Sequence, residues 1–325
     1  MSGDSHLPKA LQGLRIPAVA SPLFIISVPA LVIAQCKAGI IGSFPALNAR
    51  EGEGEHPLLD TWLTHIREEL DRHNQENPDR PAAPFAVNQI VHRSNTRLER
   101  DIELCHKHKV PVWITSLGAR VEVNQAAHDC GGIALHDIIN NKFAKKAIEK
   151  GADGLIAVAA GAGGHAGPQS PLALISEIRE WFDGPLLLSG PIATGDSILA
   201  AQARGADLAY IGSAFIATDE ANADERYKQS IVDGSANDII YSNLFTGVHG
   251  NYLRNSIEAA GLDPDNLPES DPSKMDFGDG SSKAWKDIWG SGQGVGSIKK
   301  VQSAGGYVAE LQAQYEAAKA RLMGM

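Results

Sequence analysis

The sequence has few cysteines and no pattern typical of a metal site. Its three cysteines, Cys36, Cys105 and Cys130, lie far apart and form no CxxC pair and no cysteine–histidine ligand spacing. Because small disulfide-rich folds and structural zinc sites both depend on such spacing, the sequence excludes the first and predicts no metal centre. We expect the protein to reside in a reducing cytoplasm.

Positive charge is also scarce. The chain has 29 Lys and Arg against 39 Asp and Glu, which gives a formal net charge of −10, and the basic residues form no cluster. A surface of this sign repels a phosphate backbone, so we expect no nucleic-acid partner. The sequence also lacks the GxxxxGK[ST] loop and a GxGxxG turn after its first predicted strand, which disfavours nucleoside triphosphates and a Rossmann-bound dinucleotide.

One uncharged run, Ile16 to Cys36, is long enough to cross a bilayer. Three prolines, Pro17, Pro22 and Pro29, interrupt this run. Proline disrupts a continuous helix, so the run predicts a strand, a loop and a helix, and a membrane-spanning segment is the less favoured alternative.

The chain repeats one pattern, in which a short apolar run is followed by a segment with helical periodicity. Near-continuous apolar runs are typical of strands buried on both faces of a parallel sheet. The predicted strands are Ile16–Ala20, Ile40–Phe44, Phe85–Ile90, Val110–Ser116, Gly132–His136, Gly154–Ala159, Pro185–Ser189 and Leu208–Ile211. The predicted helices are Pro29–Ala38, Leu58–His73, Asn95–His108, Arg120–Cys130, Asn141–Lys150, Pro171–Trp181 and Ser197–Arg204.

Eight strand–helix units in a chain of 325 residues predict an α/β fold, a (β/α)8 TIM barrel, rather than an open doubly wound sheet. Residues 1–218 would form the barrel core through strand eight. The pattern then changes, and residues 219–325 are expected to be helical or loop-rich. We assign them to the last barrel helix, a lid segment and a C-terminal helix of the same domain.

Glycine-rich segments follow the last three predicted strands, where the active site of a barrel lies. Gly163 and Gly164 precede His165 after strand six, and a histidine can exchange a proton near neutral pH. Ser189–Gly195 and Ile211–Phe215 follow strands seven and eight. Two such turns at adjacent strand ends favour a cradle for a mononucleotide phosphate, although turns of this kind also need glycine for their geometry alone.

Six motifs in this order, PAVASP, PFAVN, AGGHAG, SGPIATG, GADLAYIGSAF and SGQGVG, cover nearly the whole chain. With them the sequence resembles the nitronate monooxygenase family, formerly called 2-nitropropane dioxygenases. The resemblance implies a TIM barrel that holds FMN non-covalently, with His165 as the active-site histidine. The cofactor-binding residues that it implies are Asn88, Gly163, Gly164, Gly190, Ile192, Gly212, Ser213 and Gln293.

The sequence departs from the family pattern near the flavin. Leu23 stands where the family has a methionine, and the glutamine and glutamate that often precede the AGGH motif are absent. Substrate contacts are expected from Leu23 and from two histidines. His136 closes strand five, where packing in the barrel rim is the stronger interpretation, and His249 is equally consistent with a substrate contact and a surface loop.

The resemblance implies an enzyme that oxidises nitronates or nitroalkanes through the flavin and passes the electrons to O2. One alternative is an NAD(P)H-dependent reductase of quinones or enoyl thioesters on the same barrel. Another is a flavin-binding protein without catalysis. The expected partners are a small-molecule substrate and O2, or NAD(P)H in the alternative, and a homo-oligomeric assembly is left open.

Overall fold

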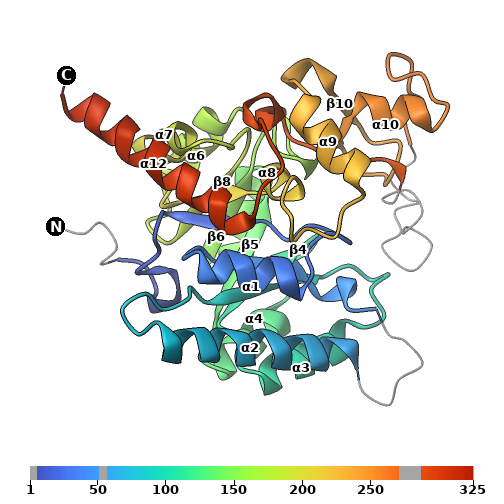
Figure 1. Cartoon of the computed structure of the whole chain (residues 1–325). Coiled ribbons are helices and arrows are strands. Elements are labelled where there is room, and N and C mark those ends of the chain that lie inside the picture. The colour runs from blue at the N-terminus through green and yellow to red at the C-terminus, as the bar shows by residue number, and fades with distance from the viewer. Residues whose placement is uncertain (1–5, 51–56, 271–286, 325) are drawn as a thin grey trace.

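Eight parallel strands close into a barrel in the computed structural model, which describes residues 6–50, 57–270 and 287–324 (Figure 1). The strands are β1 (Ala18–Ala20), β2 (Gly42–Pro45), β3 (Phe85–Ile90), β4 (Val112–Ser116), β5 (Ile133–Ile138), β6 (Gly154–Val158), β8 (Leu186–Ser189) and β9 (Leu208–Ile211). Their order is β1-β9-β8-β6-β5-β4-β3-β2. A parallel bridge from Val19 to Ile41 joins the two ends. The predicted (β/α)8 barrel is therefore confirmed, and each predicted strand lies within a few residues of an observed one.

The barrel interior is filled by alternate residues of each strand. Ile114, Leu135, Ile156, Leu187 and Tyr210 belong to one buried cluster inside the barrel. Their neighbours in sequence, such as Trp113 and Ala134, pack in a second cluster between the sheet and the helices. Burial on both faces explains why these strands appear in the sequence as near-continuous apolar runs.

Seven helices follow the strands as predicted. They are α1 (Pro29–Lys37), α2 (Leu58–Glu76), α3 (Leu98–Lys107), α4 (Val121–Asp129), α5 (Asn141–Glu149), α6 (Pro171–Arg179) and α7 (Gly195–Arg204). Local sequence sets several of their ends. The side chain of Asn140 accepts the N–H of Phe143 at the start of α5, and Gly205, with φ +113°, ends α7 in the left-handed conformation that glycine favours.

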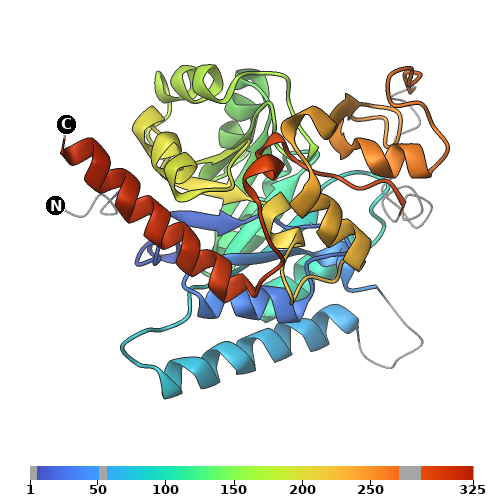
Figure 2. The same cartoon turned by 45° about the horizontal axis from the view of Figure 1, so that its top comes forward.

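The helix that completes the ring comes from the end of the chain. Helix α12 (Ala304–Met323) packs against both α7 and α1 (Figures 1 and 2). Its approach to α7 is so close that a Cβ on Gly195 would lie 2.1 Å from the Tyr315 nitrogen. Glycine is therefore required at this crossing.

The segment between β9 and α12 lies over one end of the barrel. It contains the helices α8 (Ser213–Ile216), α9 (Glu225–Asp233) and α10 (Arg254–Ala259) and the short 3-10 turns Ala236–Asp238 and Gln293–Ser297. Two further 3-10 turns, Lys9–Leu11 and Ala46–Asn48, belong to the first part of the chain. In Figure 1, α9, β10 and α10 gather at the upper right.

This segment also contains strands, so the prediction that it is only helical or loop-rich was wrong. β10 (Ile239–Ser242) and β11 (Gly250–Leu253) form an antiparallel sheet with β7 (Gly164–His165). The expected glycine-rich loop at Gly164 and His165 is thus a short strand, with His165 paired to Gly250. A two-residue strand that pairs with a distant segment leaves no periodic pattern in the sequence.

The uncharged run Ile16 to Cys36 forms β1, a loop and α1, as predicted. Across the three described ranges, none of the helices combines the length and the apolar character needed to span a bilayer.

Candidate functional site

A cavity of about 1680 Å³ opens at the carboxyl ends of the barrel strands. Loops from every part of the barrel line it, together with the segment between β9 and α12. It brings together nearly all of the residues that we predicted for the site, which are Leu23, Asn88, His136, Gly163, Gly164, His165, Gly190, Ile192, Gly212, Ser213 and His249. Its volume exceeds the roughly 300–1,000 Å³ typical of a pocket for one small ligand, so it has room for a cofactor and a second molecule.

His165 lies in β7, and its ring contacts Thr246 in the segment between β9 and α12. Its Nε2 lies 2.9 Å from Oγ1 of Thr246. The Thr246 hydroxyl donates to the Val248 carbonyl oxygen at 3.1 Å. Because that hydroxyl has a single hydrogen, the arrangement favours a ring that donates from Nε2 and carries its basic lone pair on Nδ1.

Burial changes the charge state of His165. Loss of hydration lowers the pKa of its ring to about 4. The imidazole is therefore neutral at physiological pH, and it can accept a proton or a hydrogen bond. Thr246, which orients the ring, was missed in the sequence because a single threonine in a loop carries no motif.

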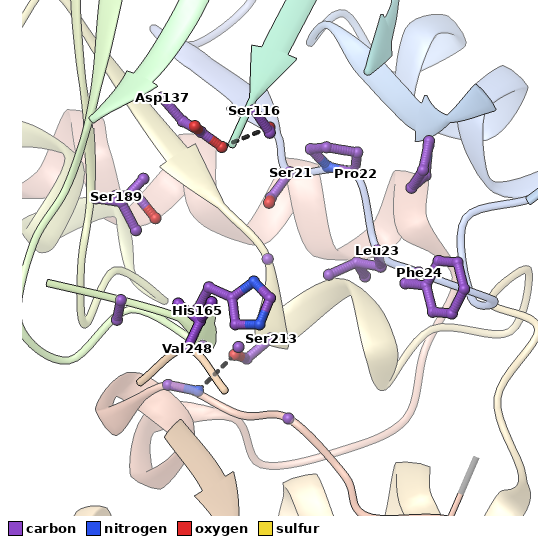
Figure 3. Close-up of a pocket in the computed structure, with 18 of the residues that line it drawn as sticks. Ser21, Pro22, Leu23, Phe24, Ser116, Asp137, His165, Ser189, Ser213 and Val248 are labelled. Atoms are coloured by element: carbon purple, nitrogen blue, oxygen red, sulfur yellow. Dashed lines mark hydrogen bonds between the residues drawn. The ribbon is translucent and has the colours of Figure 1, made fainter. Parts of the chain in front are cut away.

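The two predicted phosphate turns and the glycine-rich segment converge around Ser213. The hydroxyl oxygen of Ser213 accepts the Gly292 N–H at 2.8 Å (Figure 3). A Cβ on Gly163 would lie 2.8 Å from both of these atoms, so this crossing has no room for a side chain. Gly190 and Gly212 have negative or extended backbone angles and line the cavity.

Gln293 lies next to the cavity rather than in its lining. Its backbone N–H donates to the Gly161 carbonyl oxygen at 2.9 Å, and its side-chain oxygen lies beside Gly161. Its neighbours Gly292 and Gly294 do line the cavity. The role of Gln293 toward the cofactor stays a prediction.

The strand ends inside the barrel carry a chain of polar side chains. The amide of Asn88 on β3 donates to the Ser116 hydroxyl oxygen at 2.7 Å. The Ser116 hydroxyl, on β4, donates to Oδ2 of Asp137 at 2.5 Å. Figure 3 shows Ser116 and Asp137 together on one side of the cavity, with His165 and Ser213 on another.

Asp137, not its neighbour His136, points into the barrel. Side chains alternate along β5, so Asp137 shares the interior face with Leu135, whereas His136 borders the cavity but packs on the outer face. The His136 ring is buried against Thr115, with Nδ1 to Oγ1 at 2.5 Å, and burial lowers its pKa to about 4. The geometry favours packing for His136, and the same alternation could have identified Asp137 from the sequence.

The loop after β1 carries Leu23 into the cavity and is held in a strained shape. Ile25 has φ +67°, which is rare for a β-branched residue. Its N–H donates to Oδ1 of Asn48 at 2.9 Å, and its carbonyl oxygen accepts from Asn222 at 3.1 Å. Backbone strain of this kind persists where the surrounding structure fixes it, often at binding sites.

His249 lies at the exposed rim of the cavity. Its ring stacks on Tyr241, with 5.0 Å between ring centroids. The Tyr241 hydroxyl donates to the Ala166 carbonyl oxygen at 2.9 Å, which anchors the pair beside His165. His249 is thus a rim residue, and a substrate contact there stays a prediction.

Comparison with known proteins places this site in a family. A nitronate monooxygenase of Paraburkholderia phytofirmans is 24% identical over 291 residues, which cover 78% of each chain. A (3aS,4S,5R,7aS)-5-hydroxy-7a-methyl-1-oxo-octahydro-1H-indene-4-carboxyl-CoA dehydrogenase of Rhodococcus jostii is 24% identical over 255 residues, 77% of this chain and 67% of that one.

Among solved structures, a nitroalkane oxidase from Streptomyces ansochromogenes superposes with a TM-score of 0.74 at 24% identity, covering 94% of this chain and 97% of that one. The sequence model of the nitronate monooxygenase family matches residues 58–312, which is most of the chain. The chain therefore belongs to the nitronate monooxygenase family and is a flavin-dependent oxidoreductase.

Proposed function

We propose that this protein is an FMN-dependent nitronate monooxygenase, which oxidises a nitronate or nitroalkane and uses O2 as the electron acceptor. The observation that carries this proposal is a large cavity in which His165 faces the same space as Asn88, Gly190, Gly212 and Ser213.

The residues present fit a flavin mononucleotide. Gly190 and Gly212 leave their backbones open to the cavity, and the hydroxyl hydrogen of Ser213 is not used in its bond to Gly292. Within the described ranges, no group donates to Oδ1 of Asn88, so this oxygen can accept the N–H of a flavin ring. Bound FMN would supply the two-electron acceptor and, once reduced, the site of reaction with O2.

The neutral ring of His165 suits two roles toward the substrate. Toward an uncharged nitroalkane, the neutral imidazole takes a proton from the carbon that bears the nitro group. Toward a nitronate, which has already lost that proton, His165 serves only to bind and orient the anion. A positioned general base contributes about 10²–10⁴-fold to rate.

Replacement of His165 by alanine tests this assignment. We expect His165→Ala to lose about 10²–10⁴-fold in kcat/KM with a neutral nitroalkane and much less with the matching nitronate. Equal losses on both substrates would contradict the base role. His106→Ala, at an exposed position of α3 outside the cavity lining, is the matched control.

A second candidate is an NAD(P)H-dependent reductase of a quinone or an enoyl thioester. Two observations favour it: the cavity volume of about 1680 Å³ and the similarity to a dehydrogenase whose substrate is a CoA thioester. Anaerobic mixing with NADH separates the candidates, because rapid bleaching of the flavin is expected only from the reductase.

A further inference from the structure

Asp137 is a carboxyl group on the cavity wall for which the proposed reaction has no role. It lies at the end of β5 inside the barrel and lines the cavity (Figure 3). It accepts two hydrogen bonds, from the Ser116 hydroxyl and from the Leu117 N–H. Leu117 has φ +62°, so the backbone is held in an unusual shape where it contacts this carboxyl.

The described part of the chain places no compensating positive charge on this carboxyl. Among the described residues, no lysine, arginine or histidine forms an ion pair with Asp137, and its interactions are with Ser116, Leu117 and Tyr210. Tyr210 comes from β9, and burial raises the pKa of its hydroxyl well above the usual value, so it stays neutral. The other titratable groups on the cavity wall include His165 on β7 and Lys146 on α5.

A ligand that fills the cavity is expected to raise the pKa of Asp137 further. Burial already raises the pKa of Asp137 to about 6 in the ligand-free chain. A flat, uncharged ring placed against it removes the remaining water and brings no cation, which disfavours the ionised form further.

The neighbouring groups indicate which hydrogen-bonding partner Asp137 meets. The polar edge of a flavin ring presents a carbonyl oxygen, an N–H and a second carbonyl oxygen in sequence. Asn88 offers an accepting oxygen for the N–H and is linked to Asp137 through Ser116 by contacts of 2.7 and 2.5 Å. The group beside Asn88 then faces a carbonyl oxygen, and only a donor is favourable there.

We propose that Asp137 binds the flavin ring as a neutral carboxylic acid, so that FMN binding takes up one proton from water onto this carboxyl. This inference rests on the proposed function, because it requires FMN in this cavity. Asp137 is thus a cofactor-binding residue whose protonation couples FMN affinity to pH.

The test compares FMN dissociation constants of the wild type and Asp137→Asn at pH 6 and pH 8. The asparagine amide keeps the shape and a donor but cannot ionise. In the wild type, Asp137 must take up a proton before FMN binds, and its pKa in the free protein is about 6. The wild-type Kd should therefore rise about 50-fold from pH 6 to pH 8, relative to the Kd of the variant. Ionisation of the FMN phosphate affects both proteins equally and cancels in the ratio.

Asp224→Asn is the matched control. Asp224 also lines the cavity, but its Oδ1 pairs with Nε of Arg226 at 3.0 Å. We expect this variant to follow the wild-type pH dependence.

A second measurement needs no variant. Calorimetry of FMN binding at pH 8, in two buffers with different ionisation enthalpies, should show uptake of close to one proton by the wild type. Uptake near zero would overturn the inference even if Asp137→Asn did not fold.

The outcomes separate this inference from the proposed function. The ratio to follow is the FMN Kd of the wild type divided by that of Asp137→Asn. A ratio that does not change with pH would show that Asp137 keeps its charge state on binding. A ratio that falls as the pH rises would show a carboxylate accepting the flavin N–H. Either result overturns the inference and leaves the proposed function standing. Failure of the wild type to bind FMN at any pH overturns both.

Discussion

The neutral charge state of His165 makes the folded protein sensitive to acid in a defined way. The pKa of its ring is about 4 in the folded chain against 6.5 for the ordinary side chain. The unfolded state therefore binds a proton more tightly than the folded state, so stability falls as the pH drops below 6.5 and the loss is complete below about 4. At pH 5, relative to pH 8, this one histidine costs about 2 kcal/mol.

Removal of the ring should remove this cost. We predict that His165→Gln loses about 2 kcal/mol less stability than the wild type between pH 8 and pH 5. The assay is urea unfolding of the FMN-free proteins at both pH values, since a bound ligand adds its own stabilisation. His249→Gln, which replaces an exposed ring at the rim of the same cavity, is the matched control. An identical pH-dependent loss in His165→Gln and the wild type would refute the reasoning.

Three further predictions concern FMN binding and the orientation of His165. Gly212→Val should give a folded barrel that retains no FMN. Gly212 has a φ of −112°, and a Cβ there would have ordinary contacts of 3.4 Å, so the valine folds without strain and its methyl groups fill the cavity. Far-UV circular dichroism checks the fold, and flavin absorption of the purified variant checks FMN retention. Ser213→Ala should bind FMN about 10- to 100-fold more weakly, by fluorescence titration, and unchanged affinity would place the phosphate elsewhere. Thr246→Val should lower kcat with a nitroalkane about tenfold and shift the acid limb of the pH profile of kcat, and Thr246→Ser should restore both. An unshifted pH profile in Thr246→Val would mean that Thr246 does not orient His165.

The barrel could be predicted because its signals are local and repeated. Each strand is buried on both faces, and capping residues such as Asn140 and Gly205 mark helix ends in the sequence itself. The antiparallel sheet of β10, β11 and β7 could not be predicted, because β7 consists only of Gly164 and His165 and forms by pairing with β11, far along the chain. Pairing between distant segments depends on the folded barrel that brings them together.

The candidate site was predictable where a motif marked it and not where tertiary contacts define it. His165 and the glycine turns stand in motifs and do line one cavity. Asp137 and Ser116 stand in no motif and are linked only because β4 and β5 lie side by side. Gly212 also lines the cavity, and its φ of −112° is a backbone angle that any residue can adopt.

Anaerobic mixing of the purified, FMN-loaded protein with substrate tests the central claim most directly. The account predicts visible flavin absorption that bleaches rapidly with a nitronate, recovers when O2 is admitted, and does not bleach rapidly with NADH. Rapid bleaching by NADH together with no response to nitronates would contradict the proposed monooxygenase and favour the reductase.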